Sequence, residues 1–155
     1  MIKANQQIIQ WLKEDEYRYQ ALLITSTLDL PQWMIAAGFV RNMVWDKLHA
    51  IKPRRLNDID VIYFDPQNLS SEQDRYYQNQ LKTIAPQYPW SVKNQARMHL
   101  KNRDKPYLSC LDAMSYWPEL ETAVAASLSH YNKPELAIIA PFGCERLFQL
   151  TLSHD

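Results

Sequence analysis

The segment from Asp58 to Phe64 constrains the fold more than any other part of the chain. Its later residues are β-branched and aromatic, and turn-forming residues bound it on both sides, which is typical of a buried β-strand. Residues 40–48 and 70–84 flank it and have the spacing of helices. A strand between two helices predicts a domain that mixes α and β structure around a sheet.

The rest of the chain continues this alternation. Two short helices are expected within residues 4–28, and further helices at 109–116 and 142–150; strands are expected at 33–37, 90–98, 122–129 and 136–140. The last two strands bracket the turn-like Tyr131–Pro134 and predict a hairpin. The expected fold class is therefore α/β (α+β): a mixed sheet flanked by helices, with a small β-rich part near the C-terminus. No repeat or linker divides the sequence, so residues 1–155 are expected to form one domain.

Composition narrows the partners and the compartment. The 17 Lys and Arg residues balance the 17 Asp and Glu residues, so the charge gives no indication of nucleic-acid binding. The longest fully apolar stretch, Leu136–Phe142, is too short to span a bilayer. Two cysteines, Cys110 and Cys144, are interpreted as free thiols of a reducing compartment, and no signal peptide is recognised. We therefore expect a cytoplasmic protein without membrane contact; its oligomeric state stays open.

Glycine is scarce, and this excludes the common nucleotide-binding loops. Gly38 and Gly143 are the two glycines of the sequence. The Walker A loop and the dinucleotide-binding fingerprint each need several glycines close together. A nucleotide, if the protein binds one, must therefore be held in another way.

The strongest chemical signal is the pair of carboxylates Asp58 and Asp60. Side chains two residues apart on a strand point to the same face, so both can reach one divalent ion. Two carboxylates this close repel each other unless a cation lies between them, and hard oxygen ligands suit Mg²⁺ or Mn²⁺. The alternative is a strand end at which both carboxylates meet only water.

A second signal lies upstream, where Gly38 stands between an expected strand and an expected helix. Backbone N–H groups at such a helix N-terminus can face an anion, and Arg41 is close in sequence. Each residue also has an ordinary interpretation, Gly38 as a turn residue and Arg41 as a surface charge.

Together these motifs resemble the nucleotidyltransferase superfamily, which includes DNA polymerase beta, poly(A) polymerase and the tRNA CCA-adding enzymes. Residues 36–42, Ala-Ala-Gly-Phe-Val-Arg-Asn, are similar to the Gly-Gly-x-Val-Arg-Asp element of the CCA-adding branch, and residues 57–61, Asn-Asp-Ile-Asp-Val, to its Asp-Ile-Asp strand. Over most of its length the chain resembles a bacterial family of uncharacterised nucleotidyltransferase-like proteins. The stretches that carry this resemblance are 38–49, 58–65, 92–99, 116–119 and 140–143.

The resemblance implies a fold and a reaction. It implies a nucleotidyltransferase-like domain that moves a nucleotidyl group from an NTP to an acceptor with Mg²⁺ or Mn²⁺ as cofactor. Asp58 and Asp60 would be the catalytic residues and metal ligands. The alternatives are a catalytically degenerate module that binds a nucleotide or phosphate without turnover, and an interaction protein whose Asp pair is structural.

The remaining candidate residues come from the same resemblance. Gly38, Arg41 and Asn42 would contact the nucleotide or its phosphates, as would Asn94 and Arg97 further along the chain.

The chain also departs from the pattern. Ala37 stands where the first glycine of the pair is expected, and the stretch 90–98 has no acid where a third carboxylate belongs, with Asn94 the candidate for that place. The third carboxylate usually activates the acceptor, so its absence weakens the case for turnover more than the case for binding. The basic cluster Lys52–Arg55 is either a solvated loop or a contact for acceptor or phosphate at the mouth of the site.

Overall fold

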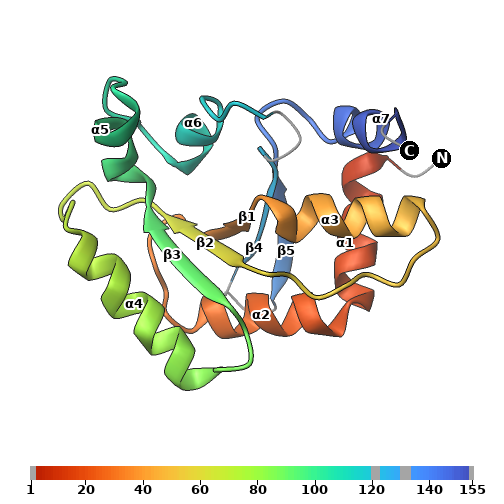
Figure 1. The fold of residues 1–155 in the computed structure, drawn as a ribbon, viewed down its shortest axis with the longest axis horizontal. Coiled ribbons are helices and arrows are strands. Elements are labelled where there is room, and N and C mark those ends of the chain that lie inside the picture. The colour runs from red at the N-terminus through yellow and green to blue at the C-terminus, as the bar shows by residue number, and fades with distance from the viewer. Residues whose placement is uncertain (1–2, 120–122, 130–133, 154–155) are drawn as a thin grey trace.

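A five-stranded mixed sheet runs through the middle of the molecule (Figure 1), and helices pack against both of its faces. The computed structural model describes residues 3–119, 123–129 and 134–153. The strands are β1 Met34–Ala36, β2 Ile59–Tyr63, β3 Trp90–Asn94, β4 Ala125–Ser129 and β5 Glu135–Ile139. The helices are α1 Ala4–Glu14, α2 Glu16–Ser26, α3 Gly38–Leu48, α4 Ser71–Ile84, α5 Met98–Asn102, α6 Cys110–Met114 and α7 Glu145–Ser153, with a 3₁₀ turn η1 at Gln95–Arg97.

The strand order is β3-β2-β1-β4-β5. β2 and β3 are parallel, and the other neighbouring strands are antiparallel. The hairpin β4–β5 joins the sheet because β4 pairs with β1, where Ile35 lies opposite Ala126. The expected α/β fold with a mixed sheet is confirmed, and its C-terminal β-rich part is an extension of the same sheet. The expected turn at 131–134 lies largely outside the described residues.

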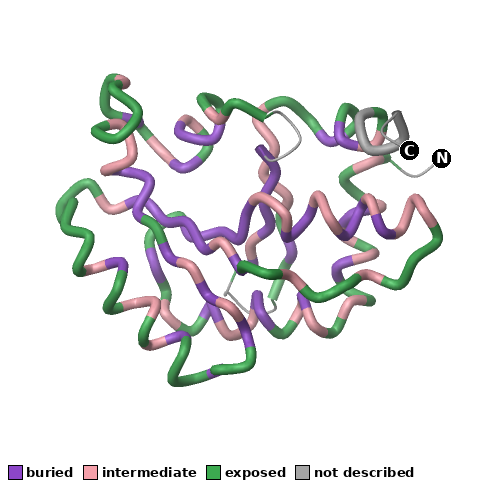
Figure 2. The backbone as a smooth tube through the Cα atoms, in the orientation of Figure 1, coloured by how far each residue is buried: buried purple, intermediate pink, exposed green. Residues whose placement is uncertain are grey.

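The larger core fills one face of the sheet. Ile59, Val61 and Tyr63 of β2 point to this face and pack with side chains of α1, α2, α3 and α4. The strands at the centre of the sheet are accordingly buried, whereas the outer sides of the helices are exposed (Figure 2). Alternation along β2 therefore leaves its other residues for the opposite face.

A smaller core covers part of that opposite face. Ile62 and Phe64 pack there with Cys110 and Met114 of α6. Asp60 shares this face with Ile62 because the two residues are two positions apart on the strand. The smaller core thus covers the carboxyl end of β2, and the carboxylates lie at the amino end of this strand.

Local signals explain most helix boundaries. Ser70 caps α4, since its hydroxyl accepts a hydrogen bond of 3.1 Å from the backbone N–H of Glu72, and Ser109 caps α6 through the N–H of Asp112. The expected helices and strands are found with ends that differ by a few residues, and two of these differences have a local cause. The expected strand 90–98 ends at Asn94, whose side chain accepts a hydrogen bond from the N–H of Ala96 and starts η1. The last helix begins at Glu145 because Gly143, with φ of 82°, makes a turn before it.

Both cysteines are free and buried, as expected of structural thiols. Burial raises the pKa of the Cys110 thiol to about 12. Burial and the charge of Glu145 raise that of Cys144 to about 11. Neither thiol is therefore activated as a nucleophile. Among the described helices, none combines the length and apolar character that crossing a bilayer requires.

Candidate active site

The carboxylates of Asp58 and Asp60 lie at the beginning of β2, on the face of the sheet that carries the smaller core. Asp60 is half-buried and lies opposite Ala36 of β1 and Ser91 of β3; Asp58 is exposed and directly precedes the strand. Burial raises the pKa of Asp60, and the nearby charge of Asp58 raises it further. Lys93 and Arg41 partly offset this increase. The ionised form of Asp60 is therefore less favourable in the protein than in water, and a nearby cation would stabilise it.

The turn that contains Gly38 lies beside this pair. β1 runs antiparallel to β2 with Ala36 opposite Asp60, so the chain leaving β1 passes Asp58 as it enters α3. A Cβ on Gly38 would lie 3.0 Å from Nδ2 of Asn42 and 3.5 Å from Nη2 of Arg41. The side chains of Arg41 and Asn42 thus fold back over the turn, where Nε of Arg41 donates to Oδ1 of Asn42 at 3.0 Å. The absent side chain leaves room for the side chains of Asn42 and Arg41 against the turn.

Two kinds of positive charge lie at this turn, which the strand register sets beside the carboxylates. The first N–H groups of α3, beginning at Gly38, have no partner within the helix, and the helix dipole adds partial positive charge there. Arg41 adds a guanidinium, which is 3.8 Å from the Glu119 carboxylate. The arrangement of two carboxylates opposite a positive helix end is suited to a metal ion that bridges to a phosphate.

Ala37 has a backbone conformation that favours glycine. Its φ is 59° and its ψ is −127°, a region that a residue with a Cβ occupies only under strain. Ala37→Gly is expected to raise the free energy of unfolding by about 1 kcal/mol, since relief of strain outweighs the added freedom of the unfolded chain. Urea unfolding measures the change. Ala36→Gly, one residue earlier in the strand, is the matched control and should lower stability; an equal loss in both variants contradicts this interpretation.

Asn94 and Arg97 lie elsewhere. Asn94 is paired with Tyr63 at the far end of β2, three residues beyond Ser91, or about 10 Å along the strand. Its buried amide is fully used: it accepts from the N–H groups of Asp65 and Ala96 and donates to the carbonyls of Asp65 and Asn68. The structure thus does not bring Asn94 to the Asp pair, and the residue opposite Asp60 is Ser91.

Arg97 is held by a buried carboxylate of α4. Its Nε donates to Oδ2 of Asp74 at 3.1 Å, and its Nη2 forms an ion pair with the same oxygen. Oδ1 of Asp74 accepts from the Tyr63 hydroxyl at 2.6 Å and from the N–H of Asn94 at 3.1 Å. This network connects β2, β3 and η1 to α4. Arg97 therefore stabilises the fold through Asp74, and the structure does not place it beside Asp58.

Sequence reasoning did not select Ser91 and Lys93, although both belong to the face of Asp60. β3 alternates between Trp90, Val92 and Asn94, which are buried, and Ser91 and Lys93, which are not. This alternation is visible in the sequence and could have placed both residues on the polar face. The parallel register with β2 sets Ser91 beside Asp60 and Lys93 beside Ile62.

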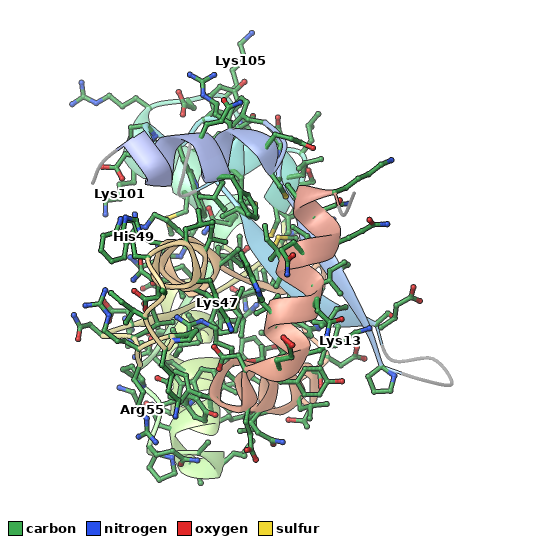
Figure 3. The ribbon with its side chains drawn as sticks, turned by 90° about the vertical axis from the view of Figure 1, so that its right-hand side faces the viewer. Lys13, Lys47, His49, Arg55, Lys101 and Lys105 are labelled. Atoms are coloured by element: carbon green, nitrogen blue, oxygen red, sulfur yellow. The ribbon has the colours of Figure 1, made fainter. Side chains whose placement is uncertain are left out.

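The segment before Asp58 is fixed to α3 by an ion pair. The buried carboxylate of Asp46 accepts from the backbone N–H of Arg54 at 2.9 Å and from its Nη2 at 2.8 Å. A cavity of about 250 Å³ lies beneath this segment, lined by Asn42, Asp46, Arg54, Arg55, Leu56 and Asn57. Figure 3 looks onto the adjoining surface, where Lys47, His49 and Arg55 lie. Arg54 and Arg55 of the basic cluster therefore line a cavity together with Asn42 of α3 and with Asn57, which directly precedes Asp58.

The Asp46–Arg54 pair makes stability depend on pH. Burial alone would raise the pKa of Asp46, but the hydrogen bonds and charge of Arg54 outweigh it and hold that pKa below 3.8. The ionised carboxylate thus stabilises the fold above this pH, and the contribution is lost as the pH falls through the lowered value. Asp46→Asn is expected to cost about 1–2 kcal/mol at pH 7. Urea unfolding measures the free energy of unfolding of the wild-type protein and of Asp46→Asn at pH 7 and at pH 3. The difference between these two free energies should be smaller at pH 3. An equal difference at both pH values contradicts the role of the ionised Asp46 carboxylate.

The donor set fits one divalent cation. Within residues 3–119, 123–129 and 134–153, no group of three or more His, Cys, Asp or Glu side chains gathers at one point. Two carboxylates leave most positions of a Mg²⁺ or Mn²⁺ ion for water and phosphate oxygens, which is how such ions bind together with nucleotides. Asp58 and Asp60 would hold the ion.

The fold is that of a nucleotidyltransferase domain. Residues 24–155 match the model of a nucleotidyltransferase family, and the chain belongs to that family. Its structure is also similar to an NMR structure described as revealing a CCA-adding enzyme head domain. The two are 34% identical, with a TM-score of 0.80, over 94% of this chain and 78% of the other. No curated protein matches the chain. The resemblance seen in the sequence is thereby confirmed.

Proposed function

We propose that this protein transfers a nucleotidyl group from an NTP to an acceptor in a reaction that depends on Mg²⁺ or Mn²⁺. The observation that carries the proposal is the register of β1 and β2, which sets the Gly38 turn beside Asp58 and Asp60. A triphosphate at the positive end of α3 thus lies next to the carboxylates that would hold the metal ion.

Asp58 and Asp60 would hold the Mg²⁺ or Mn²⁺ ion, which when bound would neutralise phosphate charge and orient the phosphate oxygens. The chain's own residues hold the nucleotide around it. The backbone at Gly38 can approach the phosphates closely because no Cβ intervenes, and Arg41 and Asn42 offer a guanidinium and an amide beside them. An acceptor oxygen attacks the α-phosphorus, the bond from that phosphorus to the bridging oxygen breaks, pyrophosphate leaves, and the acceptor proton passes to solvent. Such a reaction needs mainly positioning and charge stabilisation.

The second candidate function is nucleotide binding without turnover. The observation that favours it is the face of β3 beside the carboxylates, which offers Ser91 and Lys93 and no acid. A hydroxyl and an ammonium group are poor general bases, so activation of the acceptor would be slow. Both functions require the same metal-dependent nucleotide site.

Calorimetric titration with each of the four NTPs, with Mg²⁺, with Mn²⁺ and with EDTA, tests the shared requirement. Binding is expected only with metal. Arg41→Ala should weaken it about tenfold, the effect of one charge-assisted hydrogen bond to phosphate. Unchanged affinity in Arg41→Ala removes that residue from the phosphate site, and absence of binding under all conditions contradicts the proposal. Release of pyrophosphate by the binding-competent protein then separates transfer from binding.

A further inference from the structure

The side chains that β3 presents to the Asp pair are Ser91 and Lys93. Because β2 and β3 are parallel, paired residues point to the same face, and Ser91 is the partner of Asp60. Trp90 and Val92, which alternate with them, are buried in the larger core on the other face. Within β3, a ligand to a metal ion at Asp60 could therefore come from Ser91 or Lys93 alone.

Neither residue is a good ligand for a second divalent ion. A pair of metal ions lies about 3.5–4 Å apart and is normally bridged and flanked by carboxylates. Here the position beside Asp60 holds a neutral hydroxyl, and the exposed Lys93 holds an ammonium group close enough to act on the Asp60 carboxylate. Lysine has three donors and no acceptor, so it repels a cation and attracts phosphate.

The formal charges agree with this. Asp58, Asp60 and Lys93 together carry one net negative charge, and one divalent ion converts it to one net positive charge. Three carboxylates with two divalent ions reach the same value. The local charge that a triphosphate meets is thus similar, although one ion is present instead of two.

We propose that this site binds one divalent cation with each nucleotide, and that Lys93 contacts the phosphates in the region a second cation would otherwise occupy. The inference rests on the proposed function, because it concerns the same nucleotide site. Ser91 marks the position at which a carboxylate would create the second metal site. Lys93 is a binding residue for the triphosphate.

Manganese titration followed by electron paramagnetic resonance counts the ions, with a saturating non-hydrolysable NTP analogue present. The wild-type protein is expected to bind one Mn²⁺ per chain, after subtraction of Mn²⁺ bound to free nucleotide. Ser91→Asp is expected to bind a second Mn²⁺. The matched control, Ser71→Asp, adds a carboxylate to the exposed start of α4 and should leave the count at one.

The proposed contact of Lys93 with the phosphates is tested by measuring the affinity for the NTP analogue in the same buffer. Lys93→Ala should weaken binding of the analogue about tenfold, as expected for loss of one charge-assisted contact. Lys82→Ala, which removes an exposed lysine of α4, should leave the affinity unchanged.

The outcomes separate this inference from the proposed function. Two Mn²⁺ ions on the wild-type protein, no second ion on Ser91→Asp, or unchanged affinity in Lys93→Ala overturns the inference and leaves the nucleotide site in place. Absence of metal-dependent binding in every form overturns the proposed function, and the inference with it.

Discussion

Asp58→Asn/Asp60→Asn should lower metal-dependent NTP affinity at least about a hundredfold, or roughly 2.7 kcal/mol. The two carboxylates are the candidate ligands of the metal ion, and a neutral amide oxygen attracts a divalent cation far less than a carboxylate does. Without the ion, the negative charge of the triphosphate would not be neutralised at this position. Calorimetric titration with Mg²⁺-NTP measures the loss.

The fold should survive this double substitution. Burial and the charge of Asp58 raise the pKa of Asp60, so the ionised carboxylate destabilises the folded protein near neutral pH. Its replacement by an amide should therefore leave the melting temperature equal or slightly higher, which separates lost binding from unfolding. Asp65→Asn is the matched control, because Asp65 follows the same strand but bonds to Gln67 and Gln73. Retained affinity in the double variant contradicts the assignment of the metal site.

Arg18→Met should lower the free energy of unfolding by about 3–5 kcal/mol. Arg18 is fully buried; its Nη1 is 2.9 Å from Oδ2 of Asp15, and its Nε donates to the carbonyl of Phe39 at 2.7 Å. The substitution keeps most of the side-chain volume but removes the guanidinium that pairs with the Asp15 carboxylate. It also releases the first turn of α3, which forms the candidate phosphate site.

Chemical unfolding of Arg18→Met at pH 7 measures this cost. Arg75→Ala is the comparison, since Arg75 lies exposed on α4 with a single weak contact of 3.4 Å to the Ser71 hydroxyl, and it should change stability by less than about 0.5 kcal/mol. A loss below about 1 kcal/mol in Arg18→Met means that the buried pair and the Phe39 contact do not hold this part of the fold together.

Local signals made most of the fold predictable. The β-branched run of β2, the cap at Ser70 and the helical spacing of α3 depend on residues close in sequence, and each predicted its element. The end of β3 follows only in part from such signals, the local one being the hydrogen bond from the N–H of Ala96 to the Asn94 side chain. It depends on Asn94, whose amide bonds to residues 26 and 29 positions earlier in the chain.

The site was predictable in part for the same reason. Asp60 lies on β2 and Asp58 directly precedes it, so their spacing in an extended segment already predicts that they lie close together. The residue facing them from β3 depends on the pairing register of two strands about 30 residues apart, which a single sequence does not specify. The resemblance made Asn94 the candidate for the place of the third carboxylate, whereas the register sets Ser91 beside Asp60. The strain at Ala37 and the contact of Arg18 with Phe39 likewise exist only once distant segments have packed.

Paramagnetic broadening of backbone amide signals by Mn²⁺, recorded by ¹⁵N NMR with a bound NTP analogue, tests the central claim most directly. If Asp58 and Asp60 hold the ion beside the Gly38 turn, the broadening is centred on Gly38–Val40 and Asp58–Asp60 and is absent from the Asp58→Asn/Asp60→Asn variant. The amides of Asn94–Arg97, further along the sheet, should be much less affected. Broadening centred on Asn94–Arg97 or on Lys52–Arg55 contradicts the claim. Broadening that is the same in the double variant as in the wild-type protein also contradicts it.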